Sequence, residues 1–309
     1  MANVLPHARR MMILRALCEG CSIRSTSRLV GVDKDTVCRV ILQFGKACQA
    51  FLDDTLQHLE LGHVQVDEMH TFVGKKQRRL TTDEKKERHD IGDMWLWLAI
   101  DQKTKLIPTF HVGKRSADNA RRVMMKLSKQ LLHGLPKPHD SDNHAFQVRR
   151  FDAVTQISTD GLAAYPEAVD LAFGPYANYG VLIKEYRNRD LPNSYAPAEM
   201  IGTKRILHQG LTKRDAFSIC TSHIERQNLT VRTFMKRFNR LTLAFSKKLE
   251  NLEAAVAMYV AYYNFVWRTR HADDSGKAGK KRPTAAMMAK VTDHLWSFEE
   301  FYNTVIQYG

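Results

Sequence analysis

HVQVDEMHTFV (residues 63–73) and MWLWLAID (residues 94–101) are the two segments of this chain with the plainest strand pattern. The first alternates loosely and carries β-branched residues, whereas the second is a nearly continuous apolar run. Such a run is typical of a strand that is buried on both faces. The segment between them, residues 74–90, is too polar for a core. We therefore expect two strands joined by a long hairpin connection or a flexible insertion.

Beyond these strands, the chain alternates between strand-like and helix-like segments. Pro108 lies in a third strand-like segment and favours an edge position, because proline cannot donate a hydrogen bond within a sheet. Residues 185–220 contain prolines and glycines that predict loop broken by one short strand. The expected elements are strands at 105–112, 154–160, 178–186 and 205–208, and helices at 116–132, 161–173, 222 to beyond 240, and 249–270, the last of them amphipathic.

Residues 10–50 predict three short helices in helix-turn-helix order. Ser22 and Asp33 are suitable N-caps for the second and third helices, and Gly31 fits the tight turn between them. The N-terminal end of the third helix faces base edges when such a helix lies in the major groove of DNA. Three-helix units also occur without any DNA role, so the pattern alone leaves both interpretations open. The candidate DNA-binding residues are Lys34, Thr36 and Arg39.

The composition bounds the class of protein and its partners. The chain has 309 residues, of which 44% are hydrophobic, and no run approaches the roughly 18 consecutive apolar residues of a membrane span. Its N-terminal segment lacks the pattern of a secretory signal, so we expect a folded cytoplasmic protein with no membrane partner. The 47 lysines and arginines against 33 acidic residues give a net charge of +14. This excess favours a polyanionic partner, nucleic acid included, without identifying it.

The five cysteines do not form the pattern of a zinc module. Cys18 and Cys21 make a lone CxxC, but Cys38 and Cys48 are ten positions apart and do not supply the second pair of a zinc ribbon or finger. Reduced thiols buried on helices are the favoured interpretation, and an odd number of cysteines agrees with it.

Three acidic residues lie where a shared site is expected. The order of three strands, helix, strand, helix, strand and helix is that of an RNase H-like α/β domain. Within it, Asp67 lies inside the first strand, Asp160 ends the fourth, and Glu225 occupies the first turn of a long helix. In open α/β sheets, strand ends and adjacent helix termini converge on one crevice, so we expect these groups to meet there.

Carboxylates that meet in one pocket repel each other, and a divalent cation relieves that repulsion. Mg²⁺ prefers oxygen ligands and is commonly held by a few carboxylates together with phosphate oxygens of a substrate. Two such ions about 4 Å apart activate an attacking oxygen and stabilise a leaving one in an in-line displacement. The pattern therefore favours cleavage or transfer of a phosphodiester.

Four segments carry a resemblance to a known family. They are QVDEMHTFVGKK (65–76), MWLWLAIDQKTK (94–105), STDGLAAYPEAV (158–169) and SHIERQNLTVRT (222–233). In this order they resemble the DDE transposases of bacterial insertion sequences, most closely the IS1 family, over about residues 62–270. The resemblance implies that Asp67, Asp160 and Glu225 are catalytic and bind Mg²⁺, with Mn²⁺ as a substitute. It also implies a DNA-associated homo-oligomer that binds the terminal inverted repeats of its element, cleaves them and joins the freed strand to target DNA.

The resemblance further implies a basic residue seven positions after the glutamate, which is Arg232 here. Seven residues span about two helical turns, so Arg232 and Glu225 share a helix face and Arg232 suits a phosphate clamp. Asn228, one turn after Glu225, and His223, two residues before it, are candidates for positioning DNA or water. Other basic residues expected to follow the DNA backbone along this helix are Arg226, Lys236, Arg237 and Arg240.

Two questions stay open at the level of sequence. Glu68 adjoins Asp67 and points to the opposite side of a strand, and spacing cannot choose between them; the resemblance chooses Asp67. A DNA-binding regulator without catalysis and an RNase H-fold nuclease are alternative functions. The expected domains are an all-α helix-turn-helix unit at 1–60, an RNase H-like DDE catalytic domain at 61–245 and a C-terminal helical extension at 246–309.

Overall fold

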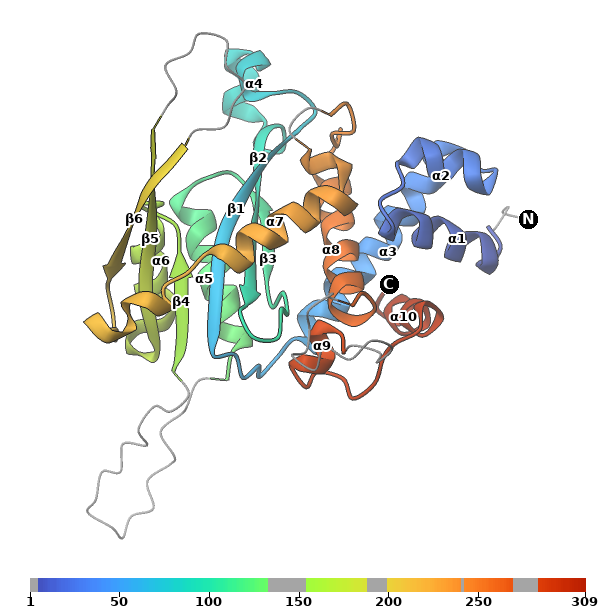
Figure 1. The fold of residues 1–309 in the computed structure, drawn as a ribbon. Helices are drawn as coiled ribbons and strands as arrows, with labels where there is room; N and C mark the ends of the chain where they lie inside the picture. The colour runs from blue at the N-terminus through green and yellow to red at the C-terminus, as the bar shows by residue number, and fades with distance from the viewer. Residues whose placement is uncertain (1–4, 133–153, 188–198, 240–241, 269–282) are drawn as a thin grey trace.

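A mixed α/β architecture is seen in the computed structural model, which describes residues 5–132, 154–187, 199–239, 242–268 and 283–309. In these ranges six strands form one sheet in the order β3-β2-β1-β4-β5-β6, with helices against both faces and a helical body along one side (Figure 1). The strands are β1 His63–Val73, β2 Gly92–Asp101, β3 Phe110–Gly113, β4 Thr155–Thr159, β5 Ala177–Arg187 and β6 Glu199–Leu207.

β1 lies inside the sheet and is paired on both sides. It pairs antiparallel with β2 and parallel with β4, and β5 continues the parallel pairing. β3 and β6 are antiparallel strands at the two edges. The register places Val66 of β1 beside Thr159 of β4. The next residue of each strand, Asp67 and Asp160, is therefore brought to the same level of the sheet.

Two strands differ from the sequence expectation. β3 begins at Phe110 rather than at 105. The backbone N–H and carbonyl of Ile107 bond to the side-chain amide of Asn264 (3.0 and 2.9 Å) and not to a neighbouring strand. β6 extends over Glu199–Leu207, where only a short strand around 205–208 is expected. Most of its residues are exposed, so the strand has no alternating apolar pattern that could reveal it.

Three helices cover the sheet: α5 (Ala117–Gln130), α6 (Tyr165–Phe173) and α7 (Ser222–Phe234). α5 and α6 lie on one face and α7 crosses the other (Figure 1). Gln65 and Asp67 of β1 contact α7, whereas Glu68 contacts the first residue of α6. Adjacent residues of β1 thus contact helices on opposite faces of the sheet, because successive side chains of a strand alternate between its two faces.

α7 ends at Phe234, so the expectation of a helix that continues beyond Arg240 is wrong. The backbone leaves helical geometry at Met235 (φ −123°, ψ 89°), and a 3-10 turn, Lys236–Phe238, follows. Met235 and Phe238 are both buried in the core, which turns the chain back toward the sheet. Arg240 itself lies outside the described residues.

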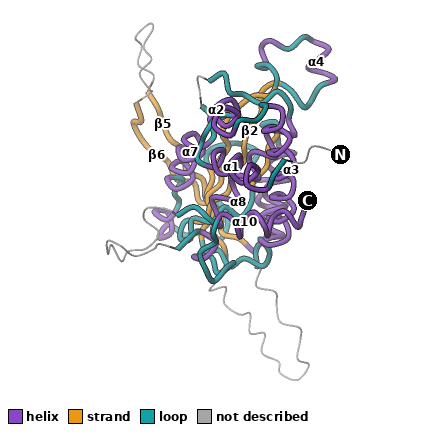
Figure 2. Tube along the Cα trace, turned by 90° about the vertical axis from the view of Figure 1, so that its right-hand side faces the viewer, coloured by secondary structure: helices purple, strands orange, loops and turns teal. Residues whose placement is uncertain are grey.

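The helical body combines N-terminal and C-terminal helices: α1 (His7–Cys18), α2 (Ile23–Val30), α3 (Lys34–Thr55), α8 (Leu249–Phe265), α9 (Ala285–Met288) and α10 (Phe298–Val305). Figure 2 shows α1, α2, α3, α8 and α10 in front of the sheet. Ser22 and Asp33 cap α2 and α3 as expected, each accepting a backbone N–H (3.0 and 2.7 Å). Gly31 adopts φ 67° in the turn between them, a left-handed conformation that favours glycine. α3 continues past residue 50 to Thr55 as one helix.

α8 joins the helical body to the sheet and is buried almost all round, rather than amphipathic as expected. Its Ala254 packs so closely against α3 that a Cβ on Gly45 would lie 2.2 Å from the Ala254 carbonyl oxygen. Near its other end, the fully buried Asn264 holds both backbone groups of Ile107. The N-terminal helices therefore reach the sheet through α8.

The remaining described elements are short. The polar connection between β1 and β2 contains a 3-10 turn, Gln77–Arg79, and α4, Thr82–Glu87, whose N-terminus is closed by a capping box of Thr81 and Glu84. Another 3-10 turn, Lys213–Ser218, precedes α7. Across the described ranges, no helix has both the length and the apolar character that crossing a bilayer requires.

Candidate active site

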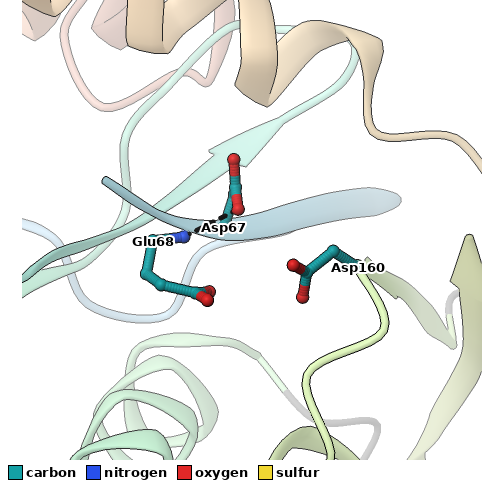
Figure 3. A group of neighbouring side chains, drawn as sticks. All are labelled: Asp67, Glu68 and Asp160. Atoms are coloured by element: carbon teal, nitrogen blue, oxygen red, sulfur yellow. Dashed lines mark hydrogen bonds between the residues drawn. The ribbon is translucent and has the colours of Figure 1, made fainter. Parts of the chain in front are cut away.

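Three carboxylates gather where β1 and β4 lie side by side. Asp67, Glu68 and Asp160 each offer an oxygen, and these oxygens lie within 4.8 Å of one another (Figure 3). β1 supplies the first two, and Asp160 follows the last residue of β4. The structure thus brings Asp67 and Asp160 together, and it adds Glu68 to them.

Glu68 leaves β1 on the opposite side from Asp67, yet its carboxylate turns toward Asp160 (Figure 3). The Glu68 side chain is only 3% exposed, and Arg115 (2.6 Å) and the Tyr165 hydroxyl (2.8 Å) engage its two oxygens. Burial raises the pKa of Glu68, as does the charge of Asp160, while the hydrogen bonds from Tyr165 and Arg115 oppose that rise. Glu68 is therefore a carboxylate whose charge Arg115 and Tyr165 partly compensate.

Asp67 is held by one backbone donor and one side-chain donor. The Glu68 N–H donates to Oδ1 (2.8 Å), and the Asn228 amide donates to Oδ2 (2.8 Å). Burial raises the pKa of Asp67 to about 7. The neighbouring charges of Glu68 and Asp160 add to the rise, and Glu225 contributes less. Ionised Asp67 is therefore costly unless a positive charge comes near it.

Glu225 lies in the first turn of α7, beside the compact group rather than within it. Its Oε1 accepts from the Thr221 hydroxyl (2.6 Å) and pairs with the Lys184 ammonium of β5. Its charge nonetheless acts on the pKa of Asp67, which shows that the two groups share one electrostatic environment. The structure thus brings two of the three expected carboxylates to close range and holds the third next to them.

α7 is fastened to β1 at two places, and both determine where Glu225 lies. The side-chain carbonyl of Gln65, which is fully buried, accepts the backbone N–H groups of the second and third residues of α7 (2.9 and 3.1 Å). These are donors that a helix N-terminus otherwise leaves unpaired. Two residues along the same face of β1, Asp67 receives the Asn228 amide. Glu225 lies between these contacts on α7.

The other residues of this helix predicted to contact DNA or water differ in exposure. Asn228 is 7% exposed and directs its amide at Asp67. His223 accepts at Nδ1 from the Lys105 ammonium (3.0 Å), and burial together with that charge lowers the pKa of His223. Arg232 is half-buried in the last turn of α7, and Lys236 is exposed just beyond the helix.

The residues predicted to read DNA lie on the helical body, at the start of α3. Lys34 and Arg39 are exposed, and half-buried Thr36 accepts from Arg39 (3.2 Å). A groove of about 710 Å³ runs beside them, and Arg9 and Arg10 of α1 contribute to its lining. The exposed end of α3 is therefore bordered by basic side chains.

The donor set of the acidic site fits a hard divalent cation. Mg²⁺ and Mn²⁺ take carboxylate oxygens as ligands, and Asp67 and Asp160 present such oxygens with Glu225 alongside. Burial, and after it the charges of Glu68 and Asp160, raise the pKa of Asp67, and a cation at the site would oppose that rise. Among the described residues, the group of side chains that lies close enough together to hold a metal ion is Asp67, Glu68 and Asp160, and it contains no cysteine.

Sequence reasoning missed several residues that surround these carboxylates. Arg115 and Lys184 are single polar residues outside the four segments that carry the resemblance, and Gln65 begins one of those segments without having been assigned a role. The one signal available was Gln65, a polar side chain in a strand where its neighbours on both sides are valines. Its burial shows only in the folded chain, where it caps α7.

The fold and the acidic site together define a mixed α/β protein that is compatible with the RNase H-like class. Residues 206–266 match the family model described as IS1 transposase. This segment runs from the end of β6 through α7 to the end of α8, and it contains Glu225, Asn228 and Arg232. No curated protein matches the chain. The match confirms the resemblance to the IS1 family within residues 206–266, which include neither Asp67 nor Asp160, and it supports an IS1-family-like transposase.

Replacing Asp67 by Asn should stabilise the metal-free protein near pH 8 and have little effect near pH 4. The pKa of Asp67 rises from 3.8 to about 7 on folding, so the folded state holds this proton more tightly. The stability that the wild-type protein gains by holding this proton is full below about pH 4 and is lost as the pH rises through about 7. Near pH 8 the variant should gain about 2–4 kcal/mol in the free energy of unfolding.

Chemical denaturation in a chelating buffer at both pH values measures this difference. Asp170→Asn removes the same charge from the exposed side of α6 and should change stability little at either pH. An Asp67→Asn protein no more stable than wild type near pH 8 would contradict the raised pKa.

Gln65→Leu should lower the free energy of unfolding by about 1–3 kcal/mol, because two N–H groups of α7 lose their buried acceptor. Gln156→Leu is the matched control on β4, where the side-chain carbonyl of the half-buried Gln156 accepts from the exposed Ser218 hydroxyl. Urea unfolding compares the two variants. Equal losses from both would show that the Gln65 cap has no special role.

Proposed function

We propose that this chain is a DNA transposase in which Asp67, Asp160 and Glu225 are the catalytic carboxylates and metal ligands of a DDE site. The observation that carries the proposal is the register of β1 and β4, which sets Asp67 beside Asp160 next to the helix that bears Glu225. The segment that matches the IS1 transposase model includes that helix and supports the proposal independently.

The strand order supports an RNase H-like catalytic domain within residues 61–245. β1 has antiparallel partners on one side and parallel partners on the other, and α5, α6 and α7 cover the two faces. In this proposal residues 1–60 are the helix-turn-helix DNA-binding domain. Residues 246–309 are a helical extension that packs on it through Gly45 and Ala254.

Asp67, Asp160 and Glu225 would hold Mg²⁺, or Mn²⁺ in its place. When bound, the cation supplies positive charge to the attacking and leaving oxygens of a phosphodiester. Asn228 keeps the Asp67 carboxylate oriented through its 2.8 Å hydrogen bond, and Gln65 keeps α7 at its distance from β1. Glu68, already paired with Arg115, supports the site from the opposite face of the sheet.

The proposed reaction has two steps on DNA. Water first attacks a phosphodiester at each end of the element, one P–O bond forms and another breaks, and a 3′-hydroxyl is released. That hydroxyl then attacks a phosphodiester of target DNA, so one strand is joined as another is cut. Arg232, two turns after Glu225 on α7, would hold a phosphate during these displacements. A homo-oligomer would hold both ends at once.

Recognition of the terminal inverted repeats is assigned to the exposed start of α3. Lys34, Thr36 and Arg39 occupy its first two turns, and the basic groove beside them offers charge to the DNA backbone. Lys236 would extend the phosphate contacts close to the catalytic domain. Phosphate contacts place the protein on DNA, whereas side chains that reach base edges specify the sequence.

Glu225→Gln should reduce strand cleavage and strand transfer at least about 100-fold in Mg²⁺, because one ligand of the cation loses its charge. The substrate is a duplex that carries the inverted repeats flanking the reading frame, and gel analysis of the products measures the loss. Glu250→Gln removes a charge at the exposed start of α8 and should retain activity. Affinity for the duplex, measured by electrophoretic mobility, should stay unchanged in both.

Three results would contradict the proposal in different ways. Equal products from wild type and Glu225→Gln reject the catalytic role of the carboxylates. Tight binding of the repeats without products from wild type in Mg²⁺ or Mn²⁺ indicates a regulator. Cleavage of an RNA–DNA hybrid or a four-way junction in preference to the repeat duplex indicates a nuclease.

Arg39→Ala should weaken binding of the repeat duplex and reduce the slope of log K against log salt concentration by about one unit if this side chain contacts a phosphate. Lys129→Ala removes one exposed positive charge from α5, on the face of the sheet away from α7, and should change neither quantity. Fluorescence anisotropy at several salt concentrations measures both. An unchanged affinity for Arg39→Ala would show that α3 does not contact DNA through this residue.

A further inference from the structure

Lys184 of β5 is a basic side chain inside the acidic site, and the proposed reaction gives it no part. β5 pairs with β4 so that Val181 lies beside Thr159, which brings the strand residues after Val181 alongside Asp160. From there the Lys184 ammonium reaches across to Glu225 Oε1 of α7. A residue of the sheet thus determines which way this carboxylate of the helix points.

The two paired carboxylates of the site differ in how far they are withdrawn from water. The Glu68 side chain is 3% exposed although its partner Arg115 is 43% exposed, whereas the Glu225 side chain is 42% exposed and its partner Lys184 is 23% exposed. A buried carboxylate is costly to leave unpaired, whereas a solvent-accessible one is hydrated when its partner leaves. Glu225 can therefore exchange its partner, while Glu68 keeps its own.

The same Glu225 oxygen that meets Lys184 also accepts from the Thr221 hydroxyl (2.6 Å). Both donors act on Oε1 and hold the carboxylate beside the close group of Asp67 and Asp160 rather than within it. Any cation that binds these two aspartates and also takes Glu225 comes close to the Lys184 ammonium. Two positive charges so near each other repel, so both cannot keep full contact with Glu225.

We propose that Lys184 is a positioning residue that holds Glu225 as its counter-ion and competes with a divalent cation for that carboxylate, thereby lowering the affinity of the site for the cation. This inference rests on the proposed function, because it takes Glu225 as a ligand. Once displaced, the ammonium stays next to the site, where a DNA phosphate is the anion that can replace Glu225. Lys184 would then couple cation binding to the arrival of DNA.

The test is a titration of the full-length protein with Mn²⁺ in the absence of DNA, with free Mn²⁺ measured by electron paramagnetic resonance. Lys184→Met should bind Mn²⁺ about 3- to 10-fold more tightly than wild type, as expected for loss of a competing, partly exposed ion pair. Lys184→Arg keeps the charge and should bind like wild type. Lys204→Met removes an exposed charge from the neighbouring strand β6 and controls for long-range attraction.

A double-mutant cycle separates action through Glu225 from a general effect of charge. In the Glu225→Gln background, Lys184→Met should no longer change the Mn²⁺ affinity. Unchanged or weaker binding by Lys184→Met, or an equal gain from Lys204→Met, overturns the proposal for Lys184 alone. If Asp67→Asn binds Mn²⁺ as tightly as wild type, the carboxylate site of the proposed function fails, and the role of Lys184 fails with it.

Discussion

The carboxylates of the site repel one another, and the side chains around them offset this repulsion. The register of β1 and β4 and the two anchors of α7 bring four acidic side chains into one electrostatic environment, and burial raises the pKa of Asp67 to about 7. The protein compensates each of them differently. Arg115 and Tyr165 close off Glu68, the Asn228 amide supports Asp67, and Lys184 draws Glu225 aside.

These differences divide the site into a permanent part and an exchangeable part. Glu68 is buried with both oxygens engaged, so it acts as a fixed support beneath Asp160. Glu225 is more exposed, and its partner is a flexible lysine. A site arranged in this way carries more negative charge than Arg115 and Lys184 neutralise. That excess explains in physical terms why a divalent cation would be accepted there.

The packing of the helices links this site to the N-terminal helices. α7 is held to β1 by Gln65 and Asn228, and α8 packs against α3 at the contact of Gly45 with Ala254. α8 also secures the segment before β3 through Asn264. The helices proposed to read DNA and the strands that carry the carboxylates are therefore parts of one continuous hydrophobic core, although they are far apart in the sequence.

Local chemistry allowed the sequence by itself to determine β1 over residues 63–73, the caps at Ser22 and Asp33, and the positions of Asp67 within one strand and of Asp160 at the end of another. These features depend on periodicity and on hydrogen bonds between residues close in the chain. The length of β6, the end of α7 and the partners of Glu68 and Glu225 were decided by the tertiary structure alone. Each depends on which surface a segment meets: Met235 and Phe238 leave the helix to enter the core, and Lys184 meets Glu225 only because β5 and α7 pack together. No local pattern encodes a contact between residues 41 positions apart.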